Sequence, residues 1–324
     1  MIEFHQRTSL RSALLGTAAK LIARPVFNYF PVTGPVAPLV HAVDFGASLA
    51  PRNKATRCEQ VTGDGWFGEL ITPRGVRSGP GALVYFHGGA FLFCGLGTHR
   101  RIVEQLSLRS GLPVLSVAYR QHGKGLVDQS IADCVDATNW MIRRGFAPGD
   151  LVLAGDSAGG HLAFAVGLEA TAQGIDLAGV VGLSPWLEFD NTERRNHPNA
   201  RRDHYIPSRR LDAVARLVTG RPILDPGQSP VNRDLTKLPP VLLMCGADEV
   251  LRYDAELMTE RLIRAGVPVR THIWEGQVHA FPVLSGLLPE SIAAVDMVAG
   301  FVNERVGSQV RRPRRLRAVA DLAV

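Results

Sequence analysis

Short apolar runs alternate with amphipathic stretches from about residue 58 onward. The runs GALVYFHGG, LPVLSVAYR, LVLAG, LAGVVGLSPW, PVLLMCGA and VPVRTHIW are typical of buried strands. Apolar residues at helical spacing predict helices over residues 99–110, 128–144, 158–171, 253–265 and 290–306. TRCEQVTG and WFGELITP predict a hairpin around residues 63–65. This alternation predicts an α/β fold in which helices cover both faces of a mostly parallel sheet.

One polar, arginine-rich segment, residues 188–236, interrupts the alternation between two predicted core strands. It is therefore expected to be an insertion above the sheet. The 324 residues, 46% of them hydrophobic, suffice for one large domain with such an insertion. The segments expected are an N-terminal segment (1–57), a first core part (58–187), the insertion (188–236), a second core part (237–306) and a disordered basic tail (307–324).

Charge and cysteine content give little sign of a macromolecular partner or a metal. The formal net charge of +6 is mild, and much of it lies in RRPRRLR near the C-terminus, with no nucleic-acid-binding motif beside it. We therefore expect a solvated tail and no nucleic-acid partner. None of the four cysteines lies in a C-x-x-C motif, so we expect no metal site and a reducing, cytoplasmic setting.

We expect neither a signal peptide nor a membrane span in the N-terminal segment. Charged residues interrupt it at Arg11, Lys20 and Arg24, and the chain contains no run of about 18 uncharged apolar residues. Leu10, Leu14 and Ala18 nevertheless share one face of a predicted helix, with Leu15 and Ile22 nearby. We expect this face to pack on the rest of the protein, while a peripheral membrane contact stays open.

A small polar motif follows the predicted strand LVLAG. It reads GDSAGG and places Ser157 at the centre of G-x-S-x-G, where a strand ends and a helix begins. Flanking glycines permit a tight turn that exposes the hydroxyl as a nucleophile. A glycine-rich turn of this kind also binds phosphate in other proteins. The lysine of a phosphate-binding loop is missing here, which favours the nucleophile.

A second glycine motif, HGGA, follows the strand that ends near Phe86. Acyl transfer develops negative charge on the carbonyl oxygen, and preorganised backbone N–H groups stabilise that charge. We expect Gly88, Gly89 and Ala158 to supply these donors. We expect His87 to face the scaffold rather than to act as the base.

Two later strands are followed by an acid and a histidine, in the chain order that a serine hydrolase of this architecture needs. Asp248 comes directly after VLLMCGA, and His279 lies in the loop QVHAF. Glu249 and Asp254 are rivals for the acid, but the strand end favours Asp248, and Asp254 is expected on a helix surface. His161 and His272 fall inside predicted elements and are expected to be structural.

Taken together, HGGA, GDSAGG, Asp248 and His279 resemble the hormone-sensitive-lipase-like esterases, the bacterial family IV of the α/β-hydrolases. SPWLEF, DLTKLPPVLL and VHAF add to the resemblance, which covers roughly residues 58–306. It implies Ser157 as nucleophile, His279 as base, Asp248 as the orienting acid, and a helical cap built from residues 1–57 and the insertion. The chain departs from the family at Asp-Glu-Val, where Asp-Pro-Leu is usual, and at YRQHGKGLVDQS.

We therefore expect a serine carboxylesterase that acts through an acyl-enzyme on short- to medium-chain esters or lipids, without a metal or an organic cofactor. The alternatives are an amidase or deacetylase of the same fold and a non-catalytic ligand-binding relative. Phe91 and Phe93 are candidates for the pocket wall or for the core. The arginines of the insertion attract acidic substrates or form a solvated face, and the second is favoured. A homodimer stays open.

Overall fold

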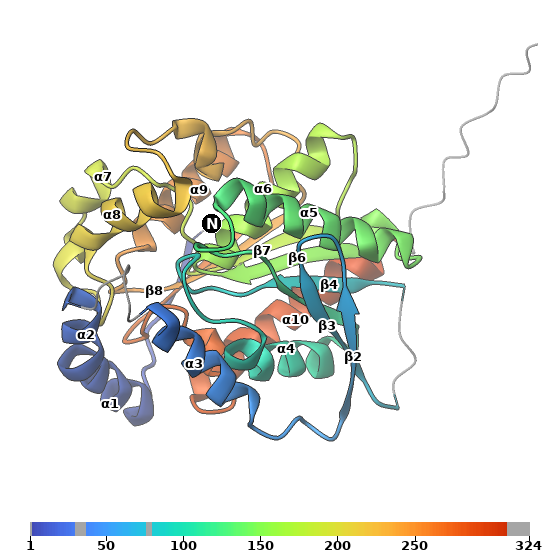
Figure 1. Cartoon of the computed structure of the whole chain (residues 1–324), viewed down its shortest axis with the longest axis horizontal. Coiled ribbons are helices and arrows are strands. Elements are labelled where there is room, and N and C mark those ends of the chain that lie inside the picture. The colour runs from blue at the N-terminus through green and yellow to red at the C-terminus, as the bar shows by residue number, and fades with distance from the viewer. Residues whose placement is uncertain (1, 30–36, 76–79, 310–324) are drawn as a thin grey trace, which may run out of the picture.

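The structure, a computed structural model, describes residues 2–29, 37–75 and 80–309, and a nine-stranded sheet forms its centre (Figure 1). The strand order is β1-β9-β8-β7-β6-β4-β5-β3-β2. Neighbours are parallel except in the pairs β2–β3 and β3–β5. The strands are β1 (Ile2–His5), β2 (Thr56–Thr62), β3 (Phe67–Pro73), β4 (Ala82–Phe86), β5 (Val114–Ala118), β6 (Leu151–Asp156), β7 (Gly179–Leu183), β8 (Val241–Gly246) and β9 (Val269–Trp274).

Helices cover both faces of the sheet because its central strands are apolar on both sides. In β4, Val84 and Phe86 pack into one core cluster, and Leu83 and Tyr85 pack into the other. Figure 1 shows α5, α6 and α9 above the sheet and α4 and α10 below it. These helices are α4 (Leu96–Ser110), α5 (Val127–Arg143), α6 (Ala158–Ala172), α9 (Arg252–Arg264) and α10 (Pro289–Gln309). The predicted α/β class, with a mostly parallel sheet, is confirmed.

Two groups of helices lie outside these layers. The N-terminal group comprises α1 (Leu10–Ala18), a π-helical turn η1 (Ala19–Ala23), α2 (Arg24–Tyr29) and α3 (Ala37–Ser48). The second group comes from the predicted insertion and comprises α7 (Thr192–Asn196) and α8 (Ser208–Thr219). Figure 1 shows α1, α2, α7 and α8 on the same side of the molecule. Short 3₁₀ turns cover Pro148–Asp150, Pro198–Arg201, Pro226–Gln228, Pro230–Asn232 and Phe281–Leu284.

Several local expectations need correction. Strand β1 has no counterpart in the sequence analysis, because four residues at a sheet edge are too short for a periodic signal. Asp254 is fully buried rather than on a helix surface. Leu10 and Leu14 are exposed, since the face of α1 that packs on the protein carries Ser12 and Gly16 instead.

Two further expectations concern the cysteines and the C-terminal tail. All four cysteines are free thiols. From residue 310 onward the expected basic tail lies outside the described residues. No helix in the described ranges is both long and apolar enough to cross a bilayer.

Candidate active site

Ser157 lies on a sharp turn between β6 and α6. Its φ of +52° and ψ of −117° are strained for a residue with a side chain, and such strain clusters at functional sites. A Cβ on Gly155 would come within 2.2 Å of the Gly159 carbonyl oxygen, and one on Gly159 within 1.9 Å of the Phe86 oxygen. Only glycine fits at either position, so the motif is a packing requirement of this turn.

His279 lies in the loop after β9, and its partner is Glu249. The distance from His279 Nδ1 to Glu249 Oε2 is 2.6 Å, and both side chains are buried. Ser184 Oγ and the Gly246 N–H donate to the other oxygen of Glu249 at 2.8 and 2.6 Å. This carboxylate is therefore held on three sides.

The structure contradicts the expectation that Asp248 faces the histidine. Asp248 is half-buried, whereas Glu249 is fully buried and bonds to His279. Strand β8 ends at Gly246, and the turn that follows directs its second acidic residue, not its first, toward the β9 loop. Glu249 was a rival in the sequence, but proximity to the strand end does not reveal which way each side chain points.

The pairing has a clear electrostatic effect on the base. Burial alone would lower the pKa of His279, but the hydrogen bond and the negative charge of Glu249 outweigh it and raise that pKa. The carboxylate thus stabilises a protonated imidazole. An imidazole that must accept a proton during a reaction needs such stabilisation.

The glycine motif after β4 does not present all the expected donors. The Gly88 N–H donates to Asp156 Oδ1 at 3.0 Å, so this donor is already satisfied inside the protein. Gly89 and Ala90 line the pocket instead, with φ values of +114° and +53°. Ala158 is the first residue of α6, as expected. The expectation for Gly88 as a donor to the pocket is therefore wrong.

A buried hydrogen-bond network around Asp156 explains why the Gly88 N–H does not face the cavity. The sequence analysis missed this network. Besides Gly88, the carboxylate accepts from Tyr85 OH at 2.8 Å and pairs with His99 Nε2 at 3.2 Å. Burial would raise the pKa of Asp156, but His99 and Tyr85 lower it overall. The pKa of His99 is raised against its burial by the same contact. The Asp of GDSAGG thus ties the HGGA loop to the serine turn.

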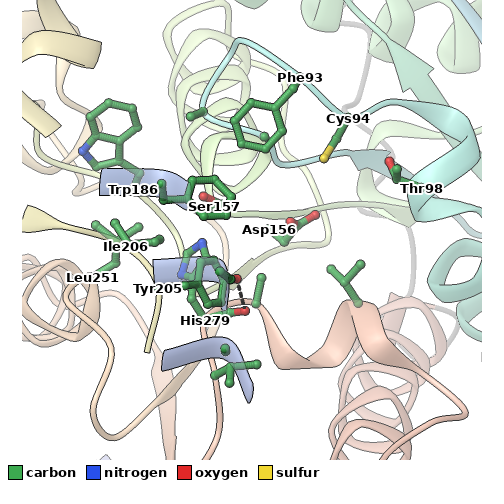
Figure 2. A pocket seen from close by; sticks show the side chains of 18 of the residues that line it. Phe93, Cys94, Thr98, Asp156, Ser157, Trp186, Tyr205, Ile206, Leu251 and His279 are labelled. Atoms are coloured by element: carbon green, nitrogen blue, oxygen red, sulfur yellow. Dashed lines mark hydrogen bonds between the residues drawn. The ribbon is translucent and has the colours of Figure 1, made fainter. Parts of the chain in front are cut away.

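Ser157 and His279 both line one apolar cavity of about 610 Å³, within the range of small-molecule sites. Figure 2 shows both beside Trp186, Tyr205 and Ile206, with the Tyr205 hydroxyl donating to the His279 carbonyl at 2.7 Å. Residues from α1, η1 and α2 form one wall: Leu15, Ala18, Ala19, Ile22, Ala23 and Phe27. Residues from α8 and the loop before it form another: Tyr205, Ile206, Pro207, Arg210, Leu211 and Val214.

The two phenylalanines after the glycine motif have different positions. Phe93 lines the cavity and lies 6.1 Å from Phe27, ring centre to ring centre. Phe91 is 1% exposed and packs against His161, Trp186 and other core rings, so of its two expected places it takes the core, and its prediction as a substrate-binding residue is wrong. Phe91 has a φ of +60°. The order of apolar residues in a loop does not predict such a turn, so the sequence could not show which of the two rings faces the cavity.

The other candidate histidines are buried in the scaffold. His87 stacks on Tyr119, with ring centres 4.5 Å apart, and burial first of all lowers its pKa to about 4. His161 Nδ1 donates to the Trp186 carbonyl oxygen at 3.0 Å, and burial lowers the pKa of His161 to about 4 as well. Both rings are therefore neutral at pH 7, and neither lines the cavity.

The arginines of the insertion do not form one solvated face. Arg194 is fully buried and makes two bonds to Asp254, at 2.9 and 2.8 Å. Arg210 is half-buried and lines the cavity. Arg195, Arg201, Arg202 and Arg209 are exposed.

One group of side chains in the described ranges could hold a metal ion. Donor atoms of Glu3, His5 and His272 lie within 4.8 Å of one another at the β1–β9 edge. His5 Nε2 and His272 Nδ1 bond to each other at 3.0 Å, and these residues do not line the cavity. The lining of the cavity includes the Ser157 hydroxyl and the His279 imidazole instead.

Comparison with known proteins agrees with this arrangement. A family described as alpha/beta hydrolase fold matches residues 83–283. The chain is 32% identical over 325 residues to the carboxylesterase/phospholipase LipF of Mycobacterium tuberculosis, covering 96% of this chain and 87% of the relative. It is 36% identical over 251 residues to the esterase LipU of the same organism, covering 74% and 84%.

Solved structures of esterases are similar as well. An esterase of the bacterial hormone-sensitive lipase family superposes with a TM-score of 0.82 at 26% identity, over 93% of this chain and all of the other. The esterase EstE5, soaked with ethyl alcohol, superposes with a TM-score of 0.84 at 26% identity over the same shares.

Proposed function

Because the chain belongs to the α/β-hydrolase family, in its hormone-sensitive-lipase-like branch, and hydrolyses esters, we propose how this site performs the reaction. Ser157 is the nucleophile, His279 the general base and Glu249 the acid that orients the base. The observation that carries the proposal is the buried His279–Glu249 pair, whose histidine lines the same cavity as a serine on a strained turn.

The first half of the reaction acylates the serine. His279 Nδ1 is bonded to Glu249, so Nε2 takes the proton of Ser157 as Oγ attacks the ester carbonyl carbon. The carbonyl π electrons move to the oxygen, where the N–H groups of Gly89, Ala90 and Ala158 stabilise the charge. Loss of one such donor typically costs about 3 kcal/mol of transition-state stabilisation. The intermediate collapses, and the alcohol leaves with the proton from His279.

The second half releases the acid. His279 removes a proton from water, whose oxygen attacks the acyl-enzyme carbonyl carbon. Collapse of this second intermediate breaks the bond to Ser157 Oγ, which recovers its proton from His279. The carboxylic acid leaves, and the enzyme returns to its starting state without a cofactor.

The apolar walls support short- to medium-chain acyl groups as substrates. Residues 1–57 and 188–236 would together act as the cap, since both contribute to these walls. Phe93 would contact the acyl chain. The relative LipF is named a phospholipase as well, so phospholipid esters belong in the substrate panel.

The test compares wild type, Ser157→Ala and Ser110→Ala on p-nitrophenyl esters from acetate to palmitate. Ser110 is a matched control because its hydroxyl bonds the Leu106 carbonyl and the Leu112 N–H at the end of α4, away from the cavity. We expect Ser157→Ala to lower the rate at least ~10³-fold on every ester, and Ser110→Ala to leave it unchanged. Full activity of Ser157→Ala would contradict the mechanism. Faster wild-type hydrolysis of matched anilides than of esters would favour the amidase alternative.

A further inference from the structure

The outer surface of the N-terminal helices carries a row of exposed leucines. Leu10, Leu14 and Leu21 are 76%, 63% and 72% exposed. Leu10 and Leu14, four residues apart, share one face of α1, and Leu21 follows in the π-helical turn η1. The opposite face is fixed to the protein. Ser12 Oγ donates to Gln277 Oε1 at 3.1 Å, and Gly16 lies against the His204 ring. The leucines therefore cannot turn inward without breaking these contacts.

Exposed apolar side chains are concentrated in the N-terminal part of the sequence, although two of them, Ile22 and Phe27, line the cavity. Sixteen large apolar residues are exposed in the described ranges, and eleven of them fall between residues 4 and 49. Single exposed leucines are ordinary on a protein surface, but a local concentration marks a surface that contacts something else. The row formed by Leu10, Leu14 and Leu21 is called the leucine row below.

The charge of this segment indicates what that contact is. No Asp or Glu occurs from residue 4 to residue 43, whereas Arg7, Arg11, Lys20 and Arg24 are all cationic. Arg7, Arg11 and Lys20 are exposed. An apolar face flanked by cations and free of acids is typical of helices that lie in the plane of an anionic lipid surface.

The insertion extends this positive charge. Arg24 donates to the Arg201 carbonyl at 3.0 Å, and Arg209 donates to Asn28 of α2 at 3.1 Å. Arg201 and Arg209 are both exposed. The helices with the leucine row therefore adjoin further cations that come from a distant part of the sequence.

We propose that the leucine row and its flanking cations dock the protein on an anionic lipid surface. The proposal rests on the proposed esterase function and extends it to the source of the substrate. Leu15, Ala19 and Ile22 of the same helices line the cavity, so the leucine row and one wall of the cavity belong to the same helices. An ester dissolved in the lipid layer could then enter the cavity beside the docked helices.

The test measures co-sedimentation of the full chain with vesicles of phosphatidylcholine, with and without phosphatidylglycerol. The variants are Leu10→Glu and Leu14→Glu, neither of which lines the cavity. Glutamate at position 10 begins α1, where an acid stabilises the helix, so folding is preserved. Ile223→Glu is the matched control, because Ile223 is 84% exposed outside this surface.

We expect wild type to bind only the phosphatidylglycerol vesicles and to dissociate as salt is raised. Each leucine variant should partition onto the vesicles about tenfold more weakly, because a leucine that inserts into the lipid is replaced by a charge of the same sign as the lipid. Ile223→Glu should bind like wild type. Hydrolysis of soluble p-nitrophenyl butyrate should be equal in all four proteins.

Two results would overturn the proposal. One is that wild type does not bind the phosphatidylglycerol vesicles, or that the leucine variants bind them as well as wild type and the control do. The other is a wild-type dimer, seen by light scattering, that Leu14→Glu dissociates while vesicles bind neither protein; the row would then be an interface between two copies. Failure of the esterase function itself would show separately, as absent hydrolysis of the soluble ester.

Discussion

The proposal that Glu249 rather than Asp248 is the acid yields a sharp test with two adjacent carboxylates. Glu249→Gln keeps the size of the side chain but removes the charge that faces His279 at 2.6 Å. Asp248→Asn makes the same chemical change one residue earlier, at a half-buried side chain. The two variants are therefore matched controls for one another.

The structure sets the size of the expected effect. Both partners are buried, with side-chain exposures of 5% for His279 and 0% for Glu249, so solvent does not screen the pair. Breaking a buried charged pair costs about 3–5 kcal/mol. If that cost falls on the transition state, where the imidazole is protonated, kcat/KM falls about 10²–10⁴-fold. Asp248→Asn should stay within about threefold of wild type.

The pH profile gives an independent readout of the same contact. His279 acts as a base only when neutral, so kcat/KM declines as the pH falls through its pKa in the free enzyme. Glu249 raises that pKa. Removing the charge should therefore move the acidic limb of the profile to lower pH in Glu249→Gln and leave it in place in Asp248→Asn.

The assay is p-nitrophenyl butyrate hydrolysis from pH 5 to 9, with circular dichroism to verify folding. A large loss in Asp248→Asn together with a near-normal Glu249→Gln would refute the assignment. Near-normal activity and an unmoved acidic limb in both variants would show that His279 works without a carboxylate partner.

Three further predictions concern the scaffold. Phe91→Ala should lower the free energy of unfolding in urea by about 3–5 kcal/mol, because it empties a core site. Phe93→Ala should mainly raise KM for esters with longer acyl chains. The reverse pattern would contradict the positions of the two rings. Arg194→Ala leaves a buried carboxylate unpaired and should cost about 3–5 kcal/mol in the same measurement; a loss below 1 kcal/mol would refute it. The lowered pKa of Asp156 stabilises the fold above about pH 4, and the raised pKa of His99 does so below about pH 6.5. His99→Gln should therefore lower the free energy of unfolding more at pH 5.5 than at pH 8. An equal loss at both pH values would contradict the ion pair.

Much of the fold follows from local pattern. Apolar strands that alternate with amphipathic helices leave few arrangements other than a parallel sheet covered on both faces. The place of Ser157 is local too, because glycine at 155 and 159 is required wherever a strand meets a helix this closely. His279 could be chosen among ten histidines because it alone lies in a loop after a late strand.

No short sequence pattern predicts the direction in which a side chain points within a loop. Asp248 and Glu249 are adjacent and chemically equivalent, and only the packing of the turn against Ser184 and Gly246 selects Glu249. Gly88 looks like a free donor until Asp156 is seen to accept its N–H. Each of these choices involves a partner about 65–70 positions away in the chain, Ser184 for Glu249 and Asp156 for Gly88.

The same distinction applies to whole surfaces. The spacing of Leu10 and Leu14 alone places them on one helical face, and the cations near them can be read directly from the sequence. Whether that face points inward depends on which side of α1 finds partners, and Ser12 and Gly16 find theirs in distant loops. The sequence by itself thus determined most of the elements, the turn that carries Ser157 and the loop that carries His279, because these depend on local backbone geometry. The tertiary structure decided which neighbouring side chain each of them meets, because burial and hydrogen bonding are settled between segments that only folding brings together.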